Sequence, residues 1–304
     1  MHGFLLIDKP AGLTSHDIVR RIRRKLGLRR VGHGGTLDPM ATGLIPVAVG
    51  DATRLLEFFS DGDKAYTATM RLGVTTDSQD AEGVVIDTAE WEHLLVGEVE
   101  AAIARMAGEI EQVPPMFSAL KKDGVPLYKL ARQGVEVERP ARTVIIRSIT
   151  MTDCSLPDVT FDVHCSKGTY VRTLAHDIGQ QLGCGAHLTA LRRTVHGPYR
   201  LDSAVPLDEF EAADAETAAG MMIPLIDVLS DFRLLQLNPE AVARLLNGVP
   251  PEMAEAVADI DLDDGEMVRL TDGEKLLAIA RYAPAREKEK RGDFELSRVF
   301  VLGQ

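Results

Sequence analysis

One aspartate stands in a sequence setting that suits a reactive carboxylate. The segment G-H-G-G-T-L-D-P-M-A-T-G covers Gly32–Gly43 and places Asp38 directly before Pro39. Proline biases the preceding residue toward an extended backbone, and the nearby glycines permit close approach of a ring or a sugar–phosphate chain. A lone carboxylate can act as a nucleophile if a neighbouring cation keeps it ionised. A turn-forming Asp before Pro is the commoner use of this pair, and the segment alone favours that structural interpretation.

No second acid lies close to Asp38 in the sequence, since the flanking acidic residues are Asp17 and Asp51. A paired carboxylate can therefore reach it only through folding. The three cysteines are far apart and form no C-x-x-C pair, which argues against a disulfide framework and a zinc site. They are Cys154, Cys165 and Cys184.

An arginine-rich helix is predicted just before the Asp38 segment. Thr14 can cap its N-terminus, Gly27 can end it, and apolar residues recur between them at helical spacing. Residues 20–30 contain seven Lys and Arg side chains and no acid. This face would suit phosphate groups, although a solvated helix surface explains the same run and is slightly favoured by the run alone.

The remaining pattern up to residue 230 predicts strands in series interrupted by helices. Strands are expected at 4–7, 44–49, 65–72, 143–152 and 159–165, and helices at 99–106 and 171–182, the second capped by Thr169. Because this order is not a regular βαβ alternation, we expect an α+β fold with a mixed, largely antiparallel sheet flanked by helices. Residues 113–142 are rich in Lys, Arg, Gly and Pro, so this segment is either functional or mobile.

A second, smaller domain is predicted after residue 230. Short strands at 267–270, 276–282 and 298–302, separated by turns, indicate a small β-barrel-like module. The domains are therefore expected at 1–230 and 231–304. Most of the formal net charge of −12 belongs to residues 201–280, whose local charge is −14, so the rest of the chain carries +2. A basic surface that could bind nucleic acid is therefore still expected outside the acidic region.

The composition is that of a globular protein, with 304 residues, 45% apolar and 26% charged. No apolar run approaches the ~18 residues of a membrane span, and the N-terminus does not resemble a signal peptide. We therefore expect no membrane partner and a cytoplasmic location.

Several further motifs accompany the Asp38 segment in a fixed order. They are K-P-A-G-L-T-S at 9–15, D-K-A-Y at 63–66, P-M-F-S-A-L-K at 115–121, S-K-G-T-Y-V-R at 166–172 and G-A-H-L-T-A-L-R-R-T at 185–194. Together with Gly32–Gly43 they resemble the TruB-type tRNA pseudouridine-55 synthases across residues 9–194. Gly34 stands where that family usually has Thr, and we expect altered loop stiffness there with activity retained.

The resemblance implies an isomerase that converts uridine to pseudouridine in the T loop of tRNA, after the base leaves its stack. In that reading Asp38 is the nucleophile, Arg172 is the cation that keeps it ionised, and Tyr66 stacks on the target base and accepts a proton. The carboxylate could attack the sugar or the pyrimidine, or assist glycal formation. No metal and no cofactor are implied.

The resemblance also implies a set of binding residues. His33 would contact the everted RNA, while Tyr170 and Leu191 would line the uracil pocket with Tyr66. Residues 113–142 match an RNA-gripping insertion that orders on binding, and residues 231–304 resemble a PUA-type RNA-binding module with a basic tail at 286–291. RNA contacts are expected from Lys9, Arg20, Arg24, Arg29, Lys121, Arg132 and Arg142. We expect a monomer whose partner is tRNA.

Two other functions fit parts of the sequence. A non-catalytic tRNA-binding or tRNA-folding protein could use the same scaffold, but the intact set of Asp38, Tyr66 and Arg172 speaks against binding alone. A carboxylate-dependent hydrolase of small molecules fits poorly with the arginine-rich helix.

Overall fold

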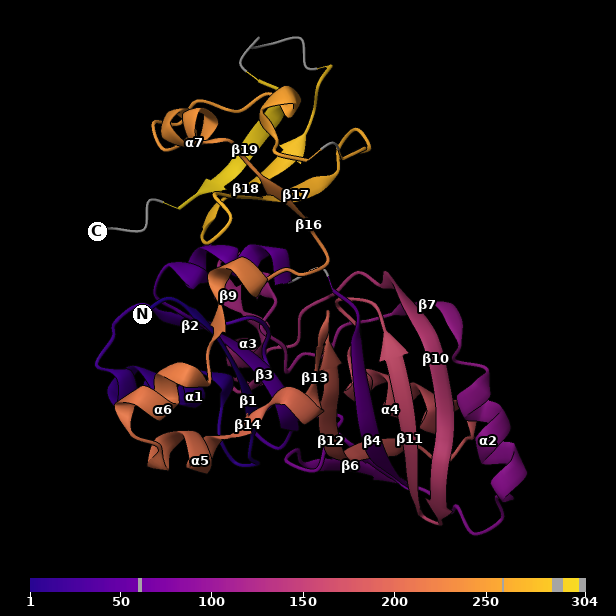
Figure 1. Cartoon of the computed structure of the whole chain (residues 1–304). Coiled ribbons are helices and arrows are strands. Elements are labelled where there is room, and N and C mark those ends of the chain that lie inside the picture. The colour runs from indigo at the N-terminus through magenta and orange to yellow at the C-terminus, as the bar shows by residue number, and fades with distance from the viewer. Residues whose placement is uncertain (60–61, 259, 286–291, 301–304) are drawn as a thin grey trace.

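The computed structural model describes residues 1–304 apart from 60–61, 259, 286–291 and 301–304 (Figure 1). The predicted basic tail at 286–291 therefore lies outside the described residues. A large unit built on a twisted sheet occupies the N-terminal part of the chain, and a smaller unit with its own sheet stands beside it. No helix in the described part of the chain is both long and apolar enough to cross a membrane.

A mixed sheet forms the centre of the large unit. Its main path runs β14-β1-β3-β12-β4-β11-β10-β7, with β2, β13 and β15 attached to β3, β12 and β1. The pairs β1–β14 and β12–β3 are parallel, while the other pairs of this sheet are antiparallel. The predicted α+β fold with a mixed, largely antiparallel sheet is thus confirmed. The strands are β1 (Gly3–Lys9), β2 (Val31–His33), β3 (Thr42–Val49), β4 (Lys64–Leu72), β7 (Gly108–Gln112), β10 (Arg142–Ser155), β11 (Asp158–Cys165), β12 (Ala186–His196), β13 (Tyr199–Arg200), β14 (Val205–Pro206) and β15 (Ile223–Pro224).

Helices and connecting elements cover both faces of this sheet. Since strand side chains alternate between faces, Leu5 and Ile7 join a core with α1, α2 and α4, whereas Phe4 and Leu6 pack toward the 3₁₀ helix η1. The helices of this unit are α1 (Ser15–Leu26), η1 (Gly50–Phe59), α2 (Val96–Ala104), α3 (Leu127–Ala131), α4 (Val171–Gln181), η2 (Leu201–Ser203), α5 (Leu207–Ala212), α6 (Ala215–Gly220) and η3 (Leu225–Asp227). Two small hairpins complete it, β5 (Val74–Thr76) with β6 (Val85–Thr88) and β8 (Lys121–Lys122) with β9 (Val125–Pro126).

Helix α1 begins and ends where the sequence predicts. The Thr14 hydroxyl accepts from the Asp17 backbone N–H, the Asp17 carboxylate accepts from the Thr14 N–H, and Gly27 closes the helix with φ 65°. The predicted cap of α4 is wrong, because Tyr170 occupies the N-cap position. The Thr169 hydroxyl instead donates to the Ser166 carbonyl (3.0 Å) and closes the turn before the helix.

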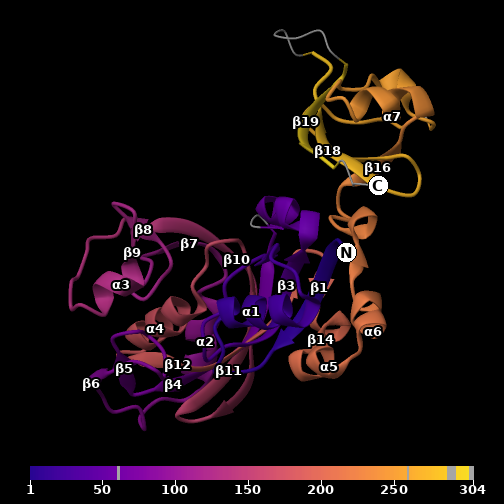
Figure 2. The same ribbon diagram turned by 90° about the vertical axis from the view of Figure 1, so that its left-hand side faces the viewer.

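The segment 113–142 leaves the sheet and carries β8, β9 and α3. Figure 2 shows these elements projecting beyond the sheet, away from the C-terminal unit. Its cations Lys121 and Arg132 are exposed. The position agrees with a segment that contacts something outside the protein.

The C-terminal unit contains a four-stranded sheet in the order β16-β17-β18-β19. The last strand begins at Phe294 rather than at the predicted residue 298, and closure into a barrel stays a prediction. The Arg54 guanidinium donates to the Val299 carbonyl (2.6 Å), and Phe300 joins the core cluster around Phe4, so this unit packs against η1. Its elements are β16 (Arg233–Gln236), α7 (Pro239–Leu245), η4 (Met253–Glu255), β17 (Met267–Thr271), β18 (Leu276–Tyr282) and β19 (Phe294–Val299).

Gly43 allows β3 and β12 to run side by side at the end of the Asp38 segment. Its φ is 96°, and an added Cβ would lie 2.4 Å from the Arg193 carbonyl oxygen. We expect Gly43→Ala to lower the free energy of unfolding by about 2 kcal/mol or more, because strain and a backbone clash add. Urea unfolding measures this.

Gly12 is the matched control, since its φ is 82° but no atom lies within 4 Å of an added Cβ. Gly12→Ala should cost only the backbone strain, about 1–2 kcal/mol. Equal losses in the two variants would show that the β3–β12 approach is not tight.

Candidate active site

Asp38 lies in the loop that joins β2 to β3, at the first position of a tight turn. The Ala41 N–H donates to the Asp38 carbonyl (3.1 Å), with Pro39 at the second position, an arrangement typical of type I turns. The turn interpretation of the sequence is therefore right for the backbone. The side chain is 33% exposed and points its carboxylate at Arg172, so the same residue is also available for chemistry.

Lys9 holds this loop from inside the protein. It is fully buried, and its ammonium donates to the carbonyls of Pro10 (3.1 Å), Pro39 (3.2 Å) and Ala41. Burial lowers the pKa of Lys9 to about 8, against the opposing effect of the Asp38 charge. The predicted RNA contact of Lys9 is wrong, because the side chain has no exposed surface to offer a phosphate.

A second buried cation, Arg193, holds the other half of the loop. It donates to the carbonyls of Leu44 (2.7 Å), Gly35 (3.3 Å) and Thr36 (3.4 Å) and is 1% exposed. It lies opposite Tyr66 in the β12–β4 register, and its positive charge lowers the pKa of the Tyr66 phenol against the effect of burial. Arg193 thus joins the Asp38 loop to the buried tyrosine.

Arg172 forms the central contact of the site. Its Nε lies 3.0 Å from Asp38 Oδ2, and its Nη2 donates to Asp38 Oδ1 (3.3 Å), a two-pronged pairing that fixes the carboxylate in orientation as well as charge. The other donors reach the carbonyls of Ser78 (3.0 Å) and Phe117 (2.8 Å) and the Asp80 carboxylate (3.2 Å). Since a guanidinium has five N–H groups, Arg172 is fully used.

Asp80 is the second carboxylate that folding brings to the site. It is 4% exposed and lies in the loop between β5 and β6, where the left-handed backbone at Gln79 (φ 64°) turns the chain. The Ser78 hydroxyl (2.6 Å) and the Glu82 N–H (3.0 Å) donate to its Oδ1. No motif in the sequence marked Asp80, and its partner Arg172 lies far from it in the chain, in α4.

Burial and the neighbouring charges shift the pKa of Asp38 in opposite directions. Burial raises the pKa of its carboxyl, and the nearby Asp80 charge raises it further, while the Arg172 guanidinium and the Lys9 ammonium lower it. Burial also raises the pKa of Tyr66, against the effect of Arg193, and the Asp38 charge adds to the rise. Each of these groups therefore depends on the charge of its neighbour.

The other predicted pocket residues surround this centre. Leu191 is 8% exposed and lies next to Arg192 and Arg193 on β12, opposite Ala68 of β4. Tyr170 is half-buried directly before α4, two residues from Arg172. His33 is half-buried on β2, and its Nδ1 is buried without a hydrogen-bond partner among the described residues.

The predicted surface cations separate into two groups. Arg20, Arg24 and Arg29 are exposed on or just after α1, and Lys121 and Arg132 are exposed on 113–142.

Gly34 needs no special space, because an added Cβ would lie 3.5 Å from Phe59 in ordinary contact. In the part of the chain that the structure describes, no group of three or more His, Cys, Asp or Glu side chains could hold a metal ion.

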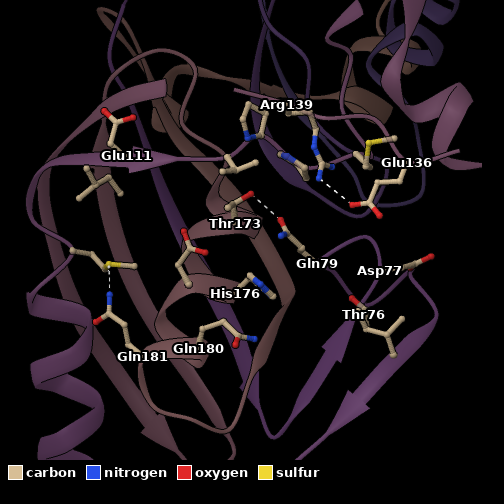
Figure 3. Close-up of a pocket in the computed structure, with 18 of the residues that line it drawn as sticks. Thr76, Asp77, Gln79, Glu111, Glu136, Arg139, Thr173, His176, Gln180 and Gln181 are labelled. Carbon is tan, nitrogen blue, oxygen red and sulfur yellow. Dashed lines mark hydrogen bonds and ion pairs between the residues drawn. The ribbon is translucent and has the colours of Figure 1, made fainter. Parts of the chain in front are cut away.

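A cavity of about 650 Å³ borders the site but does not contain Asp38, Tyr66 or Arg172 in its lining (Figure 3). Its walls come from α4, the loop after β5, the chain from the end of α2 through β7, and both ends of 113–142. The Thr173 hydroxyl donates to Gln79 Oε1 (2.7 Å) at its wall. These two residues are the chain neighbours of Arg172 and Asp80, so the cavity lies behind the ion pair.

The chain is similar to known proteins along its whole length. Residues 23–171 match the model of the TruB family pseudouridylate synthase N-terminal domain, and residues 172–230 match the tRNA pseudouridylate synthase B C-terminal domain. The tRNA pseudouridine synthase B of Syntrophotalea carbinolica is 50% identical over 304 residues, covering 100% of this chain and 99% of the relative. That of Burkholderia pseudomallei is 49% identical over 282 residues, covering 92% and 93%.

Solved structures show the same fold. The chain matches one from "Crystal Structure of a Cbf5-Nop10-Gar1 Complex" with a TM-score of 0.76 and 27% identity, covering 98% of this chain and 84% of the other. It matches one from "Crystal structure of the archaeal box H/ACA sRNP Nop10-Cbf5 complex" with a TM-score of 0.72 and 26% identity, covering 98% and 85%.

The opposing effects on Asp38 can be separated by changing Arg172. Arg172→Gln should raise the pKa of the Asp38 carboxyl above its value in the unchanged protein, because burial is then opposed by less positive charge. Carboxyl-carbon NMR titration of Asp38 measures the shift, and thermal unfolding checks that the variant is folded.

Arg172→Lys should give a smaller rise, since the charge stays while the two-pronged contact is lost. Arg147→Gln is the control, because Arg147 pairs with Asp63 on the surface (3.1 Å). An unchanged Asp38 pKa in folded Arg172→Gln would refute the proposed charge balance.

Proposed function

The chain belongs to the TruB family of pseudouridylate synthases and isomerises uridine to pseudouridine in tRNA, and we propose that its target is the uridine at position 55 of the T loop, with Asp38 as the nucleophile. The observation that carries the assignment of Asp38 is its two-pronged pairing with the buried Arg172, on a turn that leaves the carboxylate 33% exposed. In this setting Arg172 favours the ionised carboxylate against the rise in pKa that burial causes, and it fixes the carboxylate where substrate can still reach it.

The reaction itself explains why an anion is needed. Isomerisation breaks the C1′–N1 bond, turns the uracil ring, forms the C1′–C5 bond, removes the proton from C5 and leaves one on N1. Atoms and electrons balance within the substrate, so the chemistry is redox-neutral and requires no cofactor. Attack on C1′, attack on the pyrimidine and proton removal toward a glycal each begin from an ionised carboxylate, so Arg172 serves all three routes.

Tyr66 has a role that its environment limits. Burial raises its pKa, so the phenol is protonated before the reaction and first acts by packing against the base. Acceptance of the C5 proton requires the phenol to give up its own. The positive charge of Arg193 opposes the rise in the pKa of the phenol, which reduces the cost of the phenolate and supports that second role.

The binding residues are proposed with the roles that their positions allow. Tyr170 lies two residues before Arg172, and Leu191 lies two residues before Arg193 on β12; both would contact the uracil ring. His33, half-buried on β2, would stack on the everted RNA. Arg20, Arg24, Arg29, Lys121 and Arg132, all exposed, would bind phosphates of the tRNA.

We also propose the division at 1–230 and 231–304 as catalytic and PUA-like units acting in a monomer. The first unit contains every residue of the ion-pair network. A non-catalytic tRNA-binding protein is no longer favoured, because the network is intact and the relatives are named as synthases.

Replacing the nucleophile should separate binding from chemistry. We expect Asp38→Asn to lower the single-turnover rate of pseudouridine formation by at least about a thousandfold, with tRNA affinity little changed, because the amide keeps the shape but lacks the charge. Asp208→Asn, on the exposed start of α5, is the control. A normal rate in Asp38→Asn would exclude the carboxylate as nucleophile.

The position of the modified base needs a separate measurement. Unmodified tRNA transcript incubated with the protein should gain pseudouridine at position 55, and a transcript with cytidine at that position should gain none. Mapping by carbodiimide adducts and reverse transcription gives the position. Modification at another uridine would keep the activity but overturn the proposed target.

A further inference from the structure

The loop between β5 and β6 places Asp80 against Arg172, and its shape depends on one residue in an unfavourable conformation. Gln79, directly before Asp80, has a left-handed backbone with φ 64°. Residues with a long side chain rarely adopt this conformation, and they keep it only where the surroundings hold it. The contacts of Gln79 therefore control where Asp80 lies.

Hydrogen bonds within the loop make it a single unit. The Thr76 hydroxyl donates to the Asp80 carbonyl (2.7 Å), and the Ser78 hydroxyl donates to Asp80 Oδ1 (2.6 Å). The Gln79 N–H donates to the Thr76 carbonyl (3.1 Å). Because these bonds tie the loop to itself, a shift of Gln79 would carry Asp80 with it.

Gln79 joins this unit to two neighbouring elements. Its carbonyl accepts from the Leu188 N–H of β12 (3.0 Å), and its Oε1 accepts from the Thr173 hydroxyl of α4 (2.7 Å), the bond drawn in Figure 3. The backbone contact fixes the loop on the sheet, whereas the side-chain contact fixes it to α4. Gln79 is half-buried and borders the cavity of about 650 Å³, so packing holds its side chain only in part.

Thr173 offers its hydroxyl to the loop rather than to its own helix. A threonine within a helix can donate to a carbonyl of the preceding turn, and a hydroxyl has one proton to donate. Thr173 is 3% exposed, in the first turn of α4 directly after Arg172, and it donates to Gln79. The hydrogen bond therefore joins the chain neighbour of Arg172 to the chain neighbour of Asp80.

This bond differs from the two contacts that Arg172 makes with the same loop. Arg172 Nη1 donates to the Ser78 carbonyl (3.0 Å) and lies 3.2 Å from the Asp80 carboxylate, so both contacts move with the guanidinium. The Thr173–Gln79 hydrogen bond does not involve the guanidinium. It therefore keeps the acceptors of Arg172 in place when the guanidinium itself shifts.

We propose that Thr173 and Gln79 are positioning residues for the isomerisation. Their hydrogen bond holds Asp80 against α4, and Asp80 in turn keeps Arg172 aimed at Asp38. Neither residue needs to touch the substrate for this role. The inference rests on the proposed function, in which Asp38 is the nucleophile.

Thr173→Val keeps the branched shape of the side chain but removes the donor. At saturating protein, its single-turnover rate of pseudouridine formation should fall about five- to tenfold, the worth of one hydrogen bond. Its tRNA affinity should be unchanged, because the effect falls on Arg172 and not on an RNA contact. Thr173→Ser restores the hydroxyl and should recover the parent rate.

Gln79→Asn separates positioning from stability. Asparagine adopts the left-handed backbone more readily, but it is one methylene shorter, so its amide does not reach Thr173. The rate should fall as in Thr173→Val, while thermal unfolding shows a melting temperature close to that of the parent. A bond that only stabilises the fold predicts an unchanged rate.

Combined variants show which group the bond acts through. Thr173→Val and Gln79→Asn remove the same contact, so the double variant should be no slower than either alone. In an Asp80→Asn background, where Arg172 has already lost a charged partner, Thr173→Val should reduce the rate by a smaller factor than in the parent. Losses that multiply fully in either combination would refute the positioning role.

Thr160→Val is the matched control. The Thr160 hydroxyl lies 3.0 Å from the hydroxyl of Thr69, and Thr69 lies on the face of β4 opposite to Tyr66. The variant thus loses a hydroxyl contact outside the network, and its rate should equal that of the parent.

The negative results can be told apart. If either folded single variant forms pseudouridine at the parent rate, or loses tRNA affinity alone, the positioning role is refuted and the proposed function stands. If Asp38→Asn turns over at a normal rate, the proposed nucleophile fails and the positioning role fails with it.

Discussion

The site depends on keeping a carboxylate charged in a place that is partly closed to water. Burial raises the pKa of Asp38, and the opposing guanidinium of Arg172 is itself buried, so neither charge is stable there without the other. The second carboxylate, Asp80, stabilises the buried charge of Arg172 but makes ionisation of Asp38 less favourable. It gives Arg172 a partner that substrate cannot displace, but its own charge raises the pKa of Asp38. Arg172 therefore stays in position when Asp38 changes its contacts during a reaction, because its remaining donors are held by Asp80 and by two carbonyls.

The fold supplies this arrangement from segments that are distant in sequence. The Asp38 loop follows β2 of the large sheet, Asp80 follows β5 of a separate hairpin, and Arg172 lies in the first turn of α4; the contacts of Arg172 join these three segments. Rigidity of the loop comes from carbonyl groups captured by Lys9 and Arg193, both of them interior cations. The same two charges also act on the reactive groups. The Lys9 ammonium lowers the pKa of Asp38, and the Arg193 guanidinium lowers the pKa of Tyr66, each against the effect of burial.

Local patterns predicted the local structure well and the long-range contacts poorly. The capped helix α1, the strand at 65–72 and the turn at Asp38 follow from residue types a few positions apart, and the structure contains all three. Lys9 was misjudged because a lysine ends an otherwise apolar strand, where exposure is the usual outcome; three carbonyls of neighbouring loops reverse it. Asp80 has no sequence signal, since its partner is contributed by folding alone. The position of Arg193 did have a sequence signal. Alternate residues of a strand share a face, so a strand that places Leu191 in the pocket also places Arg193 on the same side.

The net charge of −12 would seem to oppose a polyanionic substrate, yet charge acts locally. At physiological ionic strength exposed charges farther apart than about 8 Å are largely screened, so the acidity of residues 201–280 counts only where RNA passes close to it. What matters for RNA is the environment of each cation. Arg172 and Arg193 are held by carboxylates and carbonyls of the protein, so their charges act within the site. Arg24 and Arg29 are exposed on or just after α1, where a phosphate could reach them. The surroundings of each cation therefore decide what it can bind, and the net charge of the chain does not.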